Sequence, residues 1–209
     1  MPQLEVPDKS NSTYITYEVY GQGTPIVLIH GWLCSAAFWE DFKVVTGWGY
    51  QLILPNLRGH GDSPPAKDVA IKTMAEDINI LLEHLNISKV IIIGHSMGGL
   101  TAQAFYHAHP DRVIALGLWN TGGKIPFGYG IGSAFYVFRI ANFLLGLLLS
   151  YPIRPLFRFV LAQGWKLGFK GWGKSEAYQK LVPIVKSMKP YAVMKAAFAL
   201  PDFKGFDHL

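Results

Sequence analysis

The first 120 residues alternate short apolar runs with segments that are apolar at helical spacing. Apolar residues recur at helical spacing after Ser35, from Ile71 to Asn86 and from Leu100 to His109. Strands that alternate with helices indicate a mostly parallel sheet with helices on both faces, an α/β fold. The runs that predict strands are rich in β-branched and aromatic residues: Thr13–Tyr20, Pro25–Ile29, Gln51–Leu54, Lys89–Ile93 and Val113–Trp119.

The pattern changes after Gly123, where apolar segments broken by prolines predict helices and no further strand of similar quality. We therefore expect residues 1–121 to form the N-terminal part of an α/β core, residues 122–200 a helical lid, and residues 201–209 a linker. Val113–Trp119 would then be an exposed, apolar sheet edge. No internal repeat is present.

Composition fits one folded domain, since half of the 209 residues are hydrophobic. The formal net charge is +5, and the basic residues gather between Lys124 and Lys204, where the acidic residues are Glu176 and Asp202. This asymmetry indicates either a solvated basic surface or a lid that touches an anionic membrane, and we expect no nucleic-acid partner. The segment 131–149 is long enough to span a bilayer, but Arg139 near its middle favours an apolar cap or a membrane-touching helix.

Several classes of site are absent from the sequence pattern. Gly21-x-Gly23 lacks the third glycine of a dinucleotide fingerprint, and no Cys/His spacing suits a metal, so we expect neither cofactor nor metal. The single cysteine, Cys34, excludes an internal disulfide and we interpret it as a packed residue. The N-terminal residues do not resemble a signal peptide, and we expect a cytoplasmic protein.

A candidate nucleophile, Ser96, lies in the segment Gly94-His95-Ser96-Met97-Gly98, between a predicted strand and a predicted helix. A serine at such a sharp turn is strained, and glycines two positions before and after it leave the room that the turn needs. The N-terminal amides of the following helix would face a developing negative charge. The alternative is an ordinary glycine-rich turn from strand to helix.

Three segments resemble the α/β-hydrolase superfamily: IVLIHGW (26–32), LPNLRGHGDS (54–63) and IIIGHSMGG (91–99). The resemblance implies that Ser96 attacks the substrate and that the backbone amides of Trp32 and Met97 form the oxyanion hole. It gives His30, Gly31, Gly94, His95 and Gly98 motif or structural roles.

A serine at position 96 implies an acyl-enzyme, hence esters, thioesters or other activated acyl substrates, as in a carboxylesterase or lipase-like enzyme. Aromatic and aliphatic residues of the expected lid favour apolar substrates. Carbon–carbon hydrolysis and perhydrolysis use the same turn, and the sequence leaves these reactions, the substrate and the oligomeric state open.

The family resemblance places the triad acid and histidine in later strands, and neither is present in this chain. A helix rises about 1.5 Å per residue, so His107 would lie too far from Ser96 to act as its base. Asp207-His208 is on the chain terminus and is a poor catalytic pair. We therefore expect an incomplete sequence whose 209-residue form is weakly active or inactive. The alternative function is a non-catalytic or membrane-associated binding protein of the same fold.

Overall fold

A computed structural model of the chain describes residues 1–9 and 11–122. Residues 71–84 and 97–108 form α-helices, as the sequence periodicity predicts, and the helix expected after Ser35 is a long 3₁₀ helix over residues 36–48. In chain order the elements are β1 (Gln3–Asp8), β2 (Asn11–Tyr20), β3 (Thr24–Ile29), η1 (Ala36–Trp48), β4 (Tyr50–Asn56), α1 (Ile71–His84), β5 (Val90–His95), α2 (Met97–Ala108), η2 (Pro110–Arg112) and β6 (Val113–Trp119).

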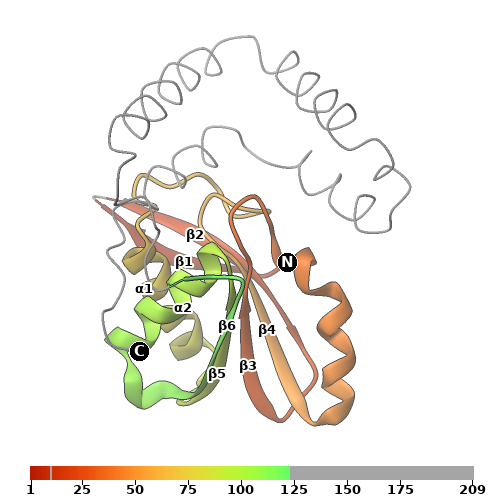
Figure 1. The fold of residues 1–209 in the computed structure, drawn as a ribbon. Helices are drawn as coiled ribbons and strands as arrows, with labels where there is room; N and C mark the ends of the chain where they lie inside the picture. Colours follow the sequence, from red (N-terminus) through yellow and green to blue (C-terminus); the bar gives the residue numbers. More distant parts are fainter. Residues whose placement is uncertain (10, 123–209) are drawn as a thin grey trace, which may run out of the picture.

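The strands form one mixed sheet in the order β1-β2-β4-β3-β5-β6. Strands β4, β3, β5 and β6 are parallel to one another, while β2 pairs antiparallel with both β1 and β4. Helices α1 and α2 lie on one face and η1 lies on the other (Figure 1). This is the mixed sheet with flanking helices that the strand and helix pattern predicts.

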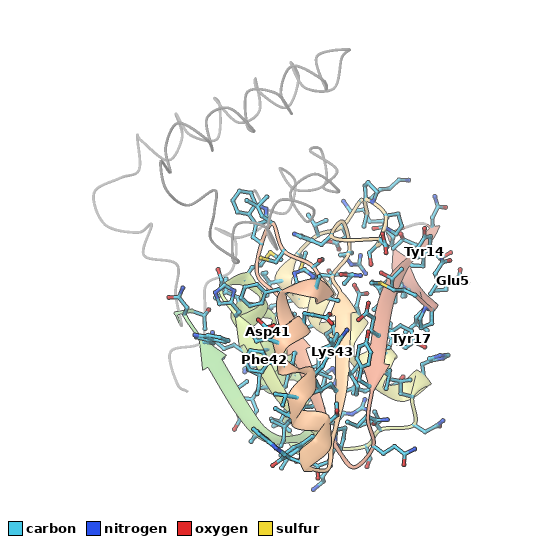
Figure 2. The ribbon with its side chains drawn as sticks, turned by 90° about the vertical axis from the view of Figure 1, so that its right-hand side faces the viewer. Glu5, Tyr14, Tyr17, Asp41, Phe42 and Lys43 are labelled. Atoms are coloured by element: carbon cyan, nitrogen blue, oxygen red, sulfur yellow. The ribbon has the colours of Figure 1, made fainter. Side chains whose placement is uncertain are left out.

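Two apolar cores are described, one between the sheet and helices α1 and α2 and the other between the sheet and η1. Alternate residues of each central strand contribute to different cores. Val27 and Ile29 of β3 pack with α1 and α2, while Ile26 and Leu28 pack with Trp39 of η1. Side chains of a strand alternate between faces, so a strand buried on both faces reads as a continuous apolar run. Figure 2 shows η1, with Asp41, Phe42 and Lys43 labelled on it, lying across its face of the sheet.

The N-terminal hairpin differs from the sequence prediction, which gave no strand before Thr13. Strand β1 is exposed along most of its length, with Val6 and Asp8 as its buried residues, so it lacks the apolar run that marks a strand. Its partner β2 supplies the backbone pairing, and the register Glu5↔Tyr14 joins two of the residues labelled in Figure 2. The helix expected after Ser35 is present, but Ser35 makes no side-chain cap.

The expected lid (122–200), linker (201–209) and membrane-length segment (131–149), with the basic residues from Lys124 onward, lie outside the described residues, Gly122 apart. Within the described part of the chain, no helix is both long and apolar enough to cross a bilayer. Strand β6 is an edge of the described sheet, and Ile114, Leu118 and Trp119 expose about half of their surface, as predicted for this strand.

A buried ion pair fixes the loop after β4 to helix α1. Arg58 is fully buried, and its Nε donates to the Oδ2 of Asp77 at 2.6 Å while its Nη2 pairs with Oδ1. The remaining guanidinium donors reach the carbonyls of Asp68 (3.0 Å) and Pro7 (3.1 Å). A buried guanidinium is tolerated because its donors are satisfied in this way.

Replacing Asp77 with Asn should destabilise the protein by about 3 kcal/mol, because the buried Arg58 charge would lose its closer anionic partner and keep only the Asp8 carboxylate at 3.7 Å. The free energy of unfolding, measured by urea denaturation, tests this. Asp111→Asn is the matched control, since Asp111 is exposed in η2 and its change should alter stability by less than about 0.5 kcal/mol. Equal effects of the two substitutions would contradict the assignment.

Candidate functional site

The carboxyl ends of the parallel strands meet at one edge of the sheet. β3 is followed there by His30, β4 by Leu57 and β5 by Ser96. The chain leaves β3 toward η1 on one face and enters β5 from α1 on the other, so a topological switch point lies between these adjacent strands. Ligands of open α/β sheets bind at such a point. Ser96 therefore lies where this fold binds small molecules.

Ser96 has a strained backbone and an uncommitted hydroxyl. Its φ of 53° and ψ of −117° lie outside the regions that side-chain-bearing residues favour. Serine at the N-cap of a helix ordinarily accepts a hydrogen bond from the first turn, but Ser96 makes no such cap. The residue is partly exposed, and the described residues give its Oγ no hydrogen-bond partner. Its hydroxyl is therefore available to a ligand.

Two glycines make this turn possible, as the sequence predicted. A Cβ on Gly94 would overlap the carbonyl of Gly98, and a Cβ on Gly98 would overlap the carbonyls of Ile29 and His30. The first turn of α2 therefore packs directly on the backbone at the end of β3. This packing brings Ser96 close to the loop that carries Gly31 and Trp32.

The loop after β3 lies close to the serine. A Cβ on Gly31 would lie 3.2 Å from the Cβ of Ser96 and 2.9 Å from the Nδ1 of His95. The buried ring of His30 holds this loop through two hydrogen bonds: its Nδ1 donates to the Gly31 carbonyl (2.8 Å), and its Nε2 accepts from the Leu57 amide (3.1 Å). The loop ends of β3 and β4 are thus joined through one side chain.

The end of β6 also holds the serine, a contact that sequence reasoning missed. The Ser96 amide donates to the Trp119 carbonyl at 3.0 Å, and the Oγ of Thr121 donates to the Ser96 carbonyl at 2.8 Å. The register between β5 and β6, with His95 opposite Trp119, produces both contacts. The only signal in the sequence was that Thr121 lies two residues after the predicted strand Val113–Trp119.

Two buried histidines flank the loops and are neutral. Burial lowers the pKa of His30 to about 3 and that of His60 to about 4. His60 donates from Nδ1 to the Arg58 carbonyl at 3.1 Å, and its buried Nε2 has no partner among the described residues. A proton on that Nε2 would be a buried charge without an acceptor, which explains the direction of the shift.

An aromatic cluster supports the serine's strand from the side of η1. His95 lies on the same face of β5 as Ile91 and Ile93, so its ring faces η1. It stacks on Phe38 with a centroid distance of 4.8 Å. Burial lowers its pKa, and its Nδ1 has no partner in the described part of the chain. The cluster comprises Phe38, Trp39, Phe42, His95 and Trp119.

Other candidates do not join the site. His107 lies in the last turn of α2, at the opposite end from Ser96, and His109 pairs with Glu76 at 2.9 Å. Burial raises the pKa of the Cys34 thiol to about 11, so Cys34 is a poor nucleophile. The described residues contain no cluster of His, Cys, Asp or Glu that could bind a metal ion.

A protein-family model described as "alpha/beta hydrolase fold" matches residues 24–135. Among curated proteins, a non-heme chloroperoxidase (CPO-A1) of Kitasatospora aureofaciens is 44% identical over 87 residues, which cover 41% of this chain and 32% of that protein. A soluble epoxide hydrolase of a Corynebacterium species is 39% identical over 103 residues, covering 49% and 35%. The matched part of the chain thus spans about a third of the length of these relatives.

A solved structure of a thermophilic esterase from Thermogutta terrifontis has a TM-score of 0.76 at 20% sequence identity. The superposition covers 98% of this chain and 74% of that chain. At this identity the likeness shows the fold.

Gly98→Ala should lower the free energy of unfolding by about 2 kcal/mol or more, because a methyl group would push the start of α2 off β3. Gly47→Ala is the matched control: a Cβ at Gly47 meets no atom within 4 Å, so the change should alter stability by less than about 1 kcal/mol. Urea denaturation of the two variants measures both effects. A stable Gly98→Ala protein would show that the packing at this turn is looser than described.

The free energy of unfolding should fall as the pH drops below the ordinary histidine pKa of 6.5. In the unfolded chain His60 is protonated below that pH, whereas in the folded protein its pKa of about 4 keeps it neutral, so acid favours the unfolded state. For His60 alone the loss between pH 8 and pH 5 is about 2 kcal/mol. His60→Asn keeps a donor for the Arg58 carbonyl and removes this titration. Its unfolding free energy should therefore fall less over this range than that of the wild type, and equal falls would refute the neutral assignment.

Proposed function

The chain belongs to the alpha/beta-hydrolase family, whose model matches more than half of it, and from this premise we propose that it is a serine hydrolase of ester or other activated acyl bonds. One observation carries the proposal: Ser96 is strained, uncapped and placed at the switch point of the sheet. Strain of this kind persists where function requires it. The fold itself accommodates many reactions, so the assignment depends on the site.

In the proposed reaction the Ser96 Oγ attacks the acyl carbonyl carbon while a general base takes its proton. The tetrahedral intermediate collapses to an acyl-serine, and the alcohol leaves with that proton. Water then attacks the acyl-serine and loses a proton to the same base, which returns that proton to the Ser96 Oγ as the acid leaves. A serine suits attack on acyl carbonyls, whereas ring opening of an epoxide by displacement at carbon needs a carboxylate nucleophile. Position 96 therefore favours acyl chemistry.

The oxyanion of the intermediate would bind the backbone amides of Met97 and Trp32. Met97 is the first residue of α2, so its N–H has no acceptor within the helix and points out of the N-terminus. Trp32 lies in the loop whose Gly31 lies close to Ser96. Each donor would contribute a few kcal/mol to transition-state stabilisation.

The base and acid are proposed to come from outside the described residues. Both ring nitrogens of His30 are occupied by backbone groups, and the ring of His95 stacks on Phe38 of η1. His107 is separated from Ser96 by the length of α2. We therefore propose that neither His30 nor His107 deprotonates Ser96.

The proposed substrate class and setting are supported by the sequence alone. We propose apolar acyl substrates in the cytoplasm, with a basic lid that can touch anionic membranes; the residues that support this lie beyond the described range.

Perhydrolysis is the second candidate, because a relative 44% identical over 87 residues is a non-heme chloroperoxidase. In that reaction hydrogen peroxide replaces water in attacking the acyl-serine, and a peroxyacid leaves.

Ser96→Ala should abolish covalent labelling by a fluorophosphonate probe and reduce ester hydrolysis by about 10³-fold or more, since the attacking atom is removed. The protein expressed from its complete coding sequence is used, and peptide mass spectrometry locates the label. Ser88→Ala, at an exposed serine in the turn before β5, is the control and should retain both activities.

Labelling elsewhere than Ser96, or ester turnover that survives Ser96→Ala, would sink the proposal. Peroxyacid formation from acetate and hydrogen peroxide, measured in parallel, separates the two candidate reactions. Absence of all three signals, with salt-sensitive sedimentation on anionic liposomes, would instead support a membrane-associated binding protein.

A further inference from the structure

The segment that follows β6 folds back onto the turn that carries Ser96. Asn120 has a positive φ of 48°, a left-handed conformation that asparagine tolerates, and it redirects the chain after Trp119. Thr121 then bonds to the Ser96 carbonyl, and the buried side chain of Gln103 donates to the Gly122 carbonyl at 3.1 Å. Helix α2 and the end of β6 are thus tied together around the serine.

Thr121 fits against the turn through a second feature, Gly99. A Cβ on Gly99 would overlap the side chain of Thr121, so the small residue at position 99 leaves the space in which Thr121 sits. The hydrogen bond and this close packing are independent observations. Together they show that Thr121 is seated on the turn rather than merely near it.

Among the described residues, three donors bond to the Ser96 carbonyl, and one of them comes from outside the helix. The amides of Gly99 (2.9 Å) and Leu100 (3.3 Å) belong to the first turn of α2, as in any helix. The Thr121 hydroxyl at 2.8 Å is the additional donor. A strained residue keeps its conformation when its surroundings over-determine it, and Thr121 supplies that extra constraint.

The geometry of the peptide bond carries the effect of Thr121 to the reaction. The Ser96 carbonyl and the Met97 N–H are the two ends of one planar, trans peptide unit, so they point in opposite directions and rotate together. A hydroxyl that fixes the carbonyl therefore fixes the direction of the N–H. It also polarises the unit, which strengthens the N–H as a donor.

We propose that Thr121 is a positioning residue that aims the Ser96–Met97 peptide, and with it the oxyanion donor and the serine hydroxyl, at the substrate. The inference rests on the proposed function. Thr121 touches no reacting atom in this scheme and acts through the peptide it holds. Its loss should slow the chemical step and leave substrate binding unchanged.

The test is the rate of fluorophosphonate labelling at Ser96 in the protein from its complete coding sequence, analysed as kinact and KI. Thr121→Val keeps the shape and removes the donor, and should lower kinact about tenfold or more at a KI within twofold of the wild type. Thr121→Ser keeps the hydroxyl donor, and its kinact should lie within about threefold of the wild-type value. Melting temperatures of all variants are measured alongside.

Thr46→Val is the matched control. Thr46 is also partly buried, and its Oγ donates to the Lys43 carbonyl at the same distance of 2.8 Å, at the far end of η1 from the site. Its removal should leave kinact unchanged. A purely structural role for threonine–carbonyl bonds would move melting temperature in both variants and kinact in neither.

The outcomes separate the two proposals. Wild-type labelling with an equal kinact for Thr121→Val, or a change confined to KI, overturns the inference and leaves the proposed function standing. No wild-type labelling at Ser96 overturns the proposed function and this inference with it. Should Thr121→Val not fold, Thr121→Ala replaces it; failure of both to fold assigns the bond to the fold and also overturns the inference.

Discussion

The close approach of α2 to the carboxyl end of β3 is the constraint on which the site depends. Because Gly98 has no side chain, α2 starts directly on the carbonyls of Ile29 and His30. Because Gly94 has none, β5 in turn lies directly against the Gly98 carbonyl. With no side chain between helix and strand, the chain must turn within one residue, and that residue is Ser96 with a φ of 53°. The strain is local, and the packing that imposes it spans three elements, as expected where a sterically unfavourable conformation survives.

The surroundings of the turn are polar yet carry little net charge. His30 and His60 are neutral through burial, with pKa values lowered to about 3 and about 4, and they use their ring nitrogens to order backbone rather than to transfer protons. The buried cation Arg58 is paired with Asp77 on α1. A weakly charged environment strengthens whatever dipoles point into it, and the amides at the start of α2 are such dipoles. Preorganised backbone donors, rather than charged side chains, are therefore the chief electrostatic feature of the described site.

Much of this architecture could be predicted because it depends on local pattern. The strands from β2 to β6 were visible as apolar runs, and the helices as periodic ones, since burial on both faces of a sheet or on one face of a helix imposes those patterns directly. Strand β1 escaped prediction because it is mostly exposed and owes its existence to pairing with β2. The sequence also did not predict that η1 is a 3₁₀ helix or that Ser35 makes no side-chain cap. The geometry of hydrogen bonds does not change the pattern of polar and apolar residues.

The sequence by itself determined the α/β class, the position of Ser96 between strand and helix, and the need for glycine at positions 94 and 98, because each depends on neighbours within a few residues. Only the tertiary structure decided what meets the serine from a distance: Thr121 on its carbonyl, Trp119 on its amide, Gly31 against its side chain and His95 turned toward η1. These contacts depend on the order and register of β3, β5 and β6, which long-range packing selects. Residues 25 apart in the chain become hydrogen-bond partners only once the sheet has formed, and no local pattern encodes that.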